Sequence, residues 1–164
     1  MTFEEYQKAA VSFLTETANN EEYLTLGLIA EVGEAAGKLA KRRRDGVWDE
    51  KAFIKELGDV LWFVANLADY WDRVVVGANY SKSLEDSFDD KTHSKLTELE
   101  DMVSAISWAS DVAEGFDYLP NLVFDIGCLA DRYGYNIEQV AEINIAKLRD
   151  RQARGVLQGN GDER

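Results

Sequence analysis

Apolar residues recur at intervals of three and four along most of this chain, and this spacing constrains its fold more than any other feature. It places apolar side chains on one face of an α-helix, whereas half-buried strands need alternation at every second residue. The only proline is Pro120, so little in the sequence interrupts helices. We therefore predict an all-α fold, a helical bundle.

The same spacing, with residues that cap helix ends, predicts six helices. The first begins at Thr2, which forms a capping box with Glu5, and ends near 17–20. The fourth has Leu96, Leu99, Val103, Ile106 and Ala113 as its inward residues. A polar loop is expected over 75–94 and an extended, glycine-rich tail over 155–164. The second to sixth helices are expected at about 21–44, 49–72, 95–114, 119–133 and 137–154, in that order.

Charge and cysteine content limit the partners and the compartment. Lys and Arg number 18 against 31 Asp and Glu, which gives a net charge of −13. Duplex nucleic acid and anionic membrane surfaces are bound mainly through cations, so neither is an expected partner. Cys128 is the only cysteine, which excludes an internal disulfide and suits a reducing compartment. With no apolar run of the roughly 20 residues that a membrane span needs, we expect a cytoplasmic protein.

Two pairs of carboxylates lie within unusually apolar segments. Glu31 and Glu34 are one turn apart in the second predicted helix, and Glu56 and Asp59 repeat that spacing in the third. Residues at i and i+3 share a helix face. The short Asp45-Gly46 connection favours antiparallel packing of the two helices, so the four acids are predicted to converge.

Converging carboxylates repel one another and resist burial, and a divalent cation relieves both problems. Mg²⁺ prefers oxygen ligands and leaves positions open for phosphate. The spacing also fits an ordinary polar seam between helices, because 31 acids in 164 residues give about six such pairs by chance. Gly33 and Gly58 lie inside the two pairs and would allow a helix or ligand to approach closely.

The segments YLTLGLIAEVGEAAGKL and KELGDVLWFVANLAD resemble the MazG-like, all-α nucleoside triphosphate pyrophosphohydrolases, whose hallmark is ExxE on one helix and ExxD on the next. A second block, YGYNIEQVAEINIAKLRDRQARGVLQGNGDER, resembles the closing helix and ending of that family. With the N-terminal FEEYQKAA, the resemblance covers about 1–72 and 125–164.

The resemblance implies Mg²⁺-dependent hydrolysis of a nucleoside triphosphate to the monophosphate and pyrophosphate, with Mn²⁺ expected to substitute. The implied metal-binding and catalytic residues are Glu31, Glu34, Glu56 and Asp59, where one of the glutamates or a metal ion activates water. Lys38 matches a phosphate-binding lysine. The residues implied to contact the triphosphate, in the same or a neighbouring subunit, are Asn144, Lys147 and Arg151.

Three points remain open at the level of the sequence. Asn66 lies two turns beyond Asp59 and contacts either the base or sugar of the substrate, or a core partner. The basic run 41–44 either steers an anionic nucleotide or complements a helix C-terminus. We expect purine deoxynucleotides as substrates. The alternatives are a pyrimidine-specific (dCTP/dUTP) enzyme of the same fold and a non-catalytic, acidic helical interaction protein.

The domain organisation departs from short family members, which pass directly from the ELGDVLWF helix to the closing block. The tripeptide Leu67–Asp69 recurs at 129–131, as though a segment had been inserted between two copies. We interpret 1–164 as a single MazG-like domain with an insert at about 73–124. Family members are usually dimers or dimers of dimers, so a homo-oligomer is expected.

Overall fold

The computed structural model describes residues 1–75 and 98–156, and all regular structure within these ranges is helical. This confirms the all-α prediction. The predicted loop from residue 76 onward, the start of the helix predicted at 95, and the tail from 157 lie outside the described residues. The described α-helices are α1 (Phe3–Val11), α2 (Glu21–Asp45), α3 (Glu50–Tyr70), α5 (Glu98–Asp111), α6 (Leu119–Asp131) and α7 (Ile137–Ala153).

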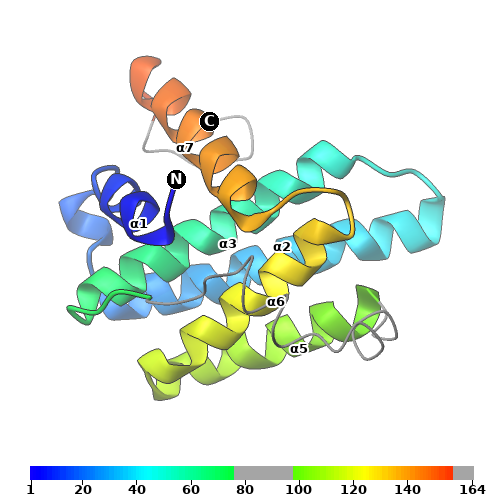
Figure 1. Ribbon diagram of the computed structural model, residues 1–164, viewed down its shortest axis with the longest axis horizontal. Coiled ribbons are helices and arrows are strands. Elements are labelled where there is room, and N and C mark those ends of the chain that lie inside the picture. The colour runs from blue at the N-terminus through cyan, green and yellow to red at the C-terminus, as the bar shows by residue number, and fades with distance from the viewer. Residues whose placement is uncertain (76–97, 157–164) are drawn as a thin grey trace.

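Local capping signals set the ends of α2 and α3, which lie side by side (Figure 1). The Asn20 side chain accepts a hydrogen bond from the backbone N–H of Tyr23 at 2.8 Å and begins α2. Gly46 ends it in the left-handed region, with φ of 71°, which costs glycine little. The Asp49 side chain then caps α3 through the Ala52 N–H at 3.0 Å.

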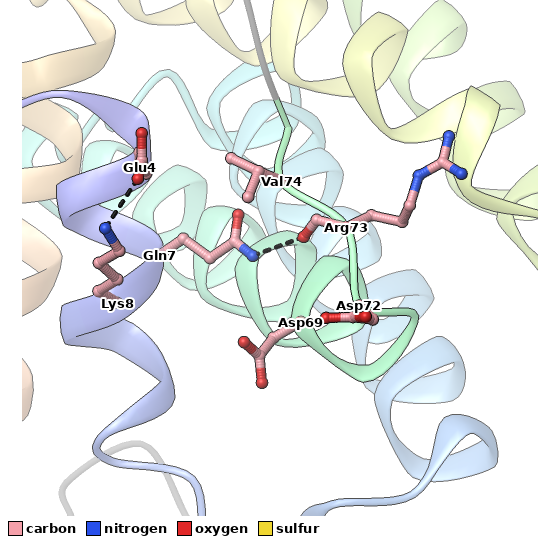
Figure 2. Close-up of a pocket in the computed structure, with 7 residues that line it drawn as sticks. All are labelled: Glu4, Gln7, Lys8, Asp69, Asp72, Arg73 and Val74. Carbon is pink, nitrogen blue, oxygen red and sulfur yellow. Dashed lines mark hydrogen bonds and ion pairs between the residues drawn. The ribbon is translucent and has the colours of Figure 1, made fainter.

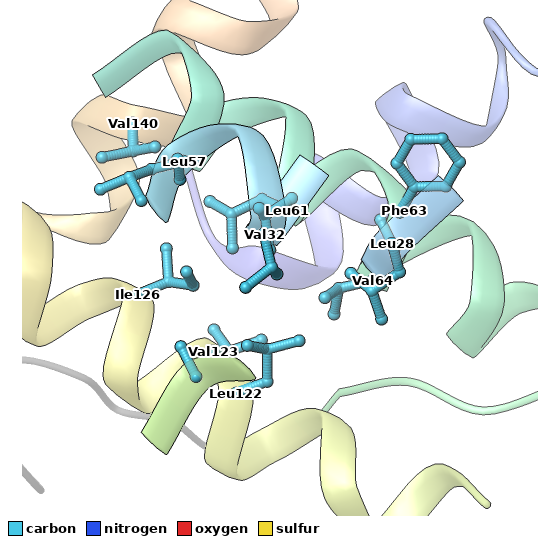
Figure 3. Packing of buried hydrophobic residues seen from close by; sticks show 14 of the residues in the cluster. Leu28, Val32, Leu57, Leu61, Phe63, Val64, Leu122, Val123, Ile126 and Val140 are labelled. Atoms are coloured by element: carbon cyan, nitrogen blue, oxygen red, sulfur yellow. The ribbon is translucent and has the colours of Figure 1, made fainter. Parts of the chain in front are cut away.

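Helix α3 is the centre of the bundle, with α1, α2, α6 and α7 packed around it. Figure 3 shows labelled side chains of α2, α3, α6 and α7 meeting in one apolar core. Each fully buried aliphatic side chain contributes about 1.5–3 kcal/mol relative to an exposed one. The residues of α3 that follow the three- and four-residue apolar spacing are all buried, namely Phe53, Leu57, Val60, Leu61, Val64, Leu67 and Ala68.

The face that α5 buries differs from the prediction. Leu99, Val103 and Ile106 are 65%, 56% and 42% exposed. The buried residues are instead Asp101, Met102, Ala105 and Ala109. Two alanines let α6 approach closely, and the Asp101 carboxylate pairs with the Arg132 guanidinium at 2.6 Å. Helix α5 therefore packs on α6 through small side chains and this ion pair, and its Leu99, Val103 and Ile106 side chains face outward.

The first helix is shorter than predicted. It begins with the expected Thr2 capping box but ends at Val11, and a 3-10 turn follows at Glu16–Ala18. The Ser12 hydroxyl donates to the Ala9 carbonyl at 2.6 Å, a side-chain bond that competes with helical backbone pairing.

The basic run at the end of α2 is tied to α5 and to the turn after α6. The Arg42 guanidinium donates to the Tyr133 hydroxyl at 2.7 Å and to the Glu98 carboxylate at 3.1 Å, and lies 4.7 Å from the centre of the Trp48 ring. Arg43 reaches the same glutamate at 3.4 Å. These contacts favour a structural role for Arg42 and Arg43 over nucleotide steering.

Candidate functional site

Three carboxylates converge where α2 lies against α3. Glu31 on α2, with Glu56 and Asp59 on α3, each offer one oxygen, and these oxygens lie within 4.8 Å of one another. All three residues are partly buried. Glu34, the fourth predicted ligand, is exposed and lies outside this group.

Burial and mutual repulsion perturb the acids of this group. Burial raises the pKa of Glu31 to about 8, and the charges of Asp59, Glu34 and Glu56 contribute to this rise, against the opposing effect of Lys147. Burial also raises the pKa of Asp59, while Lys147 lowers it. Crowded carboxylates of this kind favour either a bound proton or a bound cation.

Basic side chains approach the acids from two helices. The Lys38 ammonium, one helical turn beyond Glu34, lies 3.0 Å from the Glu56 carboxylate. Lys147 on α7 makes an ion pair with Asp59, and the charge of Arg151 also acts on Asp59. The structure therefore brings residues from the two sequence blocks together around Asp59.

The two asparagines that were predicted to contact substrate are both buried. Asn66 is 0% exposed and donates to the Trp62 carbonyl at 2.7 Å, so the core hydrogen bond is the alternative that the structure favours. Asn144 is 1% exposed and donates to the Asp59 carboxylate at 3.0 Å. Its contact with the triphosphate stays a prediction.

Tyr6 on α1 is a part of this site that the sequence interpretation missed, because its spacing marks it only as an apolar core residue. Its hydroxyl donates to the Asn144 amide oxygen at 2.9 Å. The sequence offered one signal for this role, because a tyrosine at a buried position requires a hydrogen-bond partner for its hydroxyl. The sequence does not indicate a partner 138 residues away.

The donor set fits a hard divalent cation. Three carboxylate oxygens from two helices are the ligand type that Mg²⁺ and Mn²⁺ prefer. Such a cation would also offset the repulsion that raises the pKa of Glu31. Within 1–75 and 98–156, no other group of three acids, histidines or cysteines is this close.

Comparison with known proteins identifies the family of this chain. The sequence profile of the MazG nucleotide pyrophosphohydrolase domain matches residues 19–104. The chain belongs to this MazG family. The match includes α2 and α3 with all four predicted acidic ligands, and it extends into α5, part of the segment interpreted as an insert.

A phage protein is also similar to this MazG chain. Gene 37 protein of Mycobacterium phage L5 is 43% identical over 68 residues, which cover 37% of this chain and 60% of the phage protein. The chain thus matches less than two thirds of that relative's length. No solved structure matches it. Among the described residues, none of the helices is both long and apolar enough to cross a bilayer.

A separate small cavity lies at the far end of α3 in this MazG chain (Figure 2). It has a volume of about 140 Å³ and lies between α1 and the end of α3. The Gln7 side chain donates to the Arg73 carbonyl at 2.8 Å beside it. Asp69 in its wall is ten residues beyond Asp59, or about 15 Å along the helix. The cavity is therefore distinct from the carboxylate group.

Proposed function

We propose that this protein is a Mg²⁺-dependent pyrophosphohydrolase that converts a nucleoside or deoxynucleoside triphosphate to the monophosphate and pyrophosphate. The observation that carries the proposal is the carboxylate group of Glu31, Glu56 and Asp59, with its oxygens within 4.8 Å. Family membership supports the class of reaction. Mn²⁺ is expected to replace Mg²⁺ because it accepts the same oxygen ligands.

The side chains around the carboxylates suit phosphate chemistry. A divalent cation held there would neutralise phosphate charge and lower the pKa of the attacking water. Lys38 on α2 pairs with Glu56, and Lys147 on α7 pairs with Asp59. Both ammonium groups would therefore be available to bind the phosphates of a triphosphate held by a metal ion at these acids. Hydrolysis of a phosphoanhydride bond depends on positioning and charge neutralisation more than on a nucleophilic side chain.

The choice of nucleotide substrate is a separate prediction from the type of reaction. We expect purine deoxynucleotides to be preferred, with a dCTP- or dUTP-specific enzyme as the alternative. A non-catalytic interaction protein would need no metal. It would also leave the partly buried Glu31, Glu56 and Asp59 without a role that offsets their repulsion.

Product analysis tests the reaction and the metal together. The eight common ribo- and deoxynucleoside triphosphates are incubated with the protein and Mg²⁺, with and without excess chelator. Monophosphate and pyrophosphate are expected in equal amounts, and chelator should abolish both. Glu56→Gln should be inactive, whereas Glu22→Gln, an exposed glutamate on α2, should retain wild-type activity. No turnover of any nucleotide by folded protein with Mg²⁺ or Mn²⁺ would contradict the proposal.

We also propose a homo-oligomer, a dimer or a dimer of dimers, assembled through α2. The supporting observation is an apolar stripe on its outer face, where Tyr23, Leu26 and Ile29 are 46%, 60% and 40% exposed. At Gly33 and Gly37 a Cβ atom would meet nothing within 4 Å. Glycine in the middle of a helix costs about 1 kcal/mol relative to alanine. The contacts within one subunit do not explain why glycine occupies these two positions.

Replacement of Leu26 by Glu should shift the assembly to a smaller species, because a charge would then lie in the buried part of the interface. Sedimentation equilibrium or light scattering after gel filtration measures the mass. Val47→Glu is the matched control, since Val47 is 74% exposed in the α2–α3 connection. A monomeric wild-type protein, or equal masses for all three proteins, would contradict assembly through α2.

A further inference from the structure

A continuous hydrogen-bonded chain connects the first helix to a carboxylate of the site. The Tyr6 hydroxyl on α1 contacts the Asn144 amide oxygen on α7 at 2.9 Å. The amide nitrogen of Asn144 contacts the Asp59 carboxylate on α3 at 3.0 Å. Tyr6 is 0% exposed and Asn144 is 1% exposed, so water does not substitute for either contact.

The donors and acceptors in this chain have one direction. A carboxylate only accepts, so Asn144 must present its NH₂ group to Asp59. Its oxygen then faces Tyr6, whose hydroxyl must donate. Burial, with a contribution from the charge of Asp59, raises the pKa of Tyr6 well above its usual value, so the hydroxyl keeps its proton. Asp59 therefore sets the direction of the chain, and the Tyr6 hydroxyl completes it by holding the amide oxygen on the side away from the carboxylate.

The backbone beside Asp59 is shaped for this contact. A Cβ atom on Gly58 would lie 3.0 Å from the Asn144 Cβ and 3.4 Å from its amide nitrogen. Glycine at this position allows α7 to approach α3 closely enough for the amide to reach the carboxylate. Lys147, one turn further along α7, pairs with the other oxygen of Asp59.

We propose that Tyr6 and Asn144 are positioning residues that hold the Asp59 carboxylate in the orientation required for metal binding. This inference rests on the proposed function, because it takes Asp59 to be a metal ligand. Partners behind a metal-binding side chain commonly change metal affinity by 10–100-fold when they are removed. Neither residue touches substrate in this interpretation, and both act through Asp59.

Binding of Mn²⁺, measured by calorimetry or by electron paramagnetic resonance without nucleotide, tests the proposal. Tyr6→Phe removes only the hydroxyl and should weaken Mn²⁺ binding about tenfold. Asn144→Leu should weaken it by at least as much. Because Tyr6 acts through Asn144, the double variant should bind no more weakly than Asn144→Leu alone. Tyr118→Phe, which loses a hydroxyl bond to Glu114, should bind as the wild type does.

The outcomes separate this proposal from the proposed function. Unchanged Mn²⁺ affinity in Tyr6→Phe and Asn144→Leu would overturn the positioning role, even if their melting temperatures fell. Additive losses in the double variant would show that Tyr6 acts by another route and would also overturn it. Wild-type protein that binds no Mn²⁺ would overturn it together with the metal site. The wild type could also hydrolyse no nucleotide while the variants bind Mn²⁺ more weakly than it does. That result would support the positioning role and contradict only the proposed reaction.

Discussion

Replacing Glu31 by Gln is expected to abolish activity and yet stabilise the metal-free protein. A catalytic metal ion contributes several kcal/mol to transition-state stabilisation, so loss of one ligand should lower kcat/KM at least about a thousandfold. In chelator, the same change removes a partly buried acid that Asp59, Glu34 and Glu56 repel. The melting temperature should therefore rise, by about 3 °C for each kcal/mol gained.

The stabilising effect should depend on pH in a defined direction. The pKa of Glu31 is about 8 in the folded chain against an ordinary value of 4.5, so the folded state holds the proton more tightly. The contribution of Glu31 to wild-type stability consequently falls as the pH rises from 4.5 to 8. Glutamine does not titrate, so the advantage of Glu31→Gln should be small at the acidic end of this range and largest above its upper limit.

Thermal unfolding in chelator at several pH values, beside Mg²⁺-dependent activity, measures both effects. Glu22→Gln is the matched control because it changes an exposed glutamate on the same helix. A lower melting temperature for Glu31→Gln would show that the contacts made by the Glu31 carboxylate stabilise the fold more than its repulsion destabilises it. Retained activity would exclude Glu31 as a metal ligand.

Replacing Arg132 by Met should destabilise the fold by about 3 kcal/mol, because a buried carboxylate loses its cation. The Asp101 side chain is 2% exposed and lies 2.6 Å from the guanidinium. Chemical denaturation measures the loss. Asp101→Asn in the same chain should recover part of it, since the remaining amide carries no charge.

Arg154→Met provides the control for this prediction. Arg154 also pairs with an aspartate, Asp150, at 2.9 Å, but the two side chains are 50% and 65% exposed. Exposed pairs contribute only about 0–1 kcal/mol. Equal losses from Arg132→Met and Arg154→Met would contradict the assignment of Asp101 as a buried charge that depends on Arg132.

Most of the helices were predictable because their signals are local. The Thr2 capping box, the Asn20 and Asp49 caps and the left-handed Gly46 all act within four residues of a helix end. The buried face of α5 was not predictable in this way. Leu99, Val103 and Ile106 are exposed, while Asp101 is buried against Arg132, a contact across 31 residues that spacing within one helix does not indicate.

At the site, too, local sequence patterns were predictive, whereas contacts between distant segments were not. The i, i+3 spacing of acids and a short connection bring Glu31, Glu56 and Asp59 together, whereas Glu34, which the prediction also included, lies outside the group. The predicted contacts of Asn144 and Asn66 with substrate depended on how deeply each lies, which α1 and α7 determine by packing on α3. Tyr6 has a polar role only because α7 brings an amide against it.

The connection between the two ends of the chain has a consequence for biosynthesis. Asp59 obtains its partners Asn144 and Lys147 from a helix that begins at Ile137. The ribosome completes α1, α2 and α3 well before that helix has been translated, and contacts between such distant segments form late in folding. A nascent chain therefore has its acidic residues before it has the groups that orient them, and the site is complete only after α7 has packed on α3.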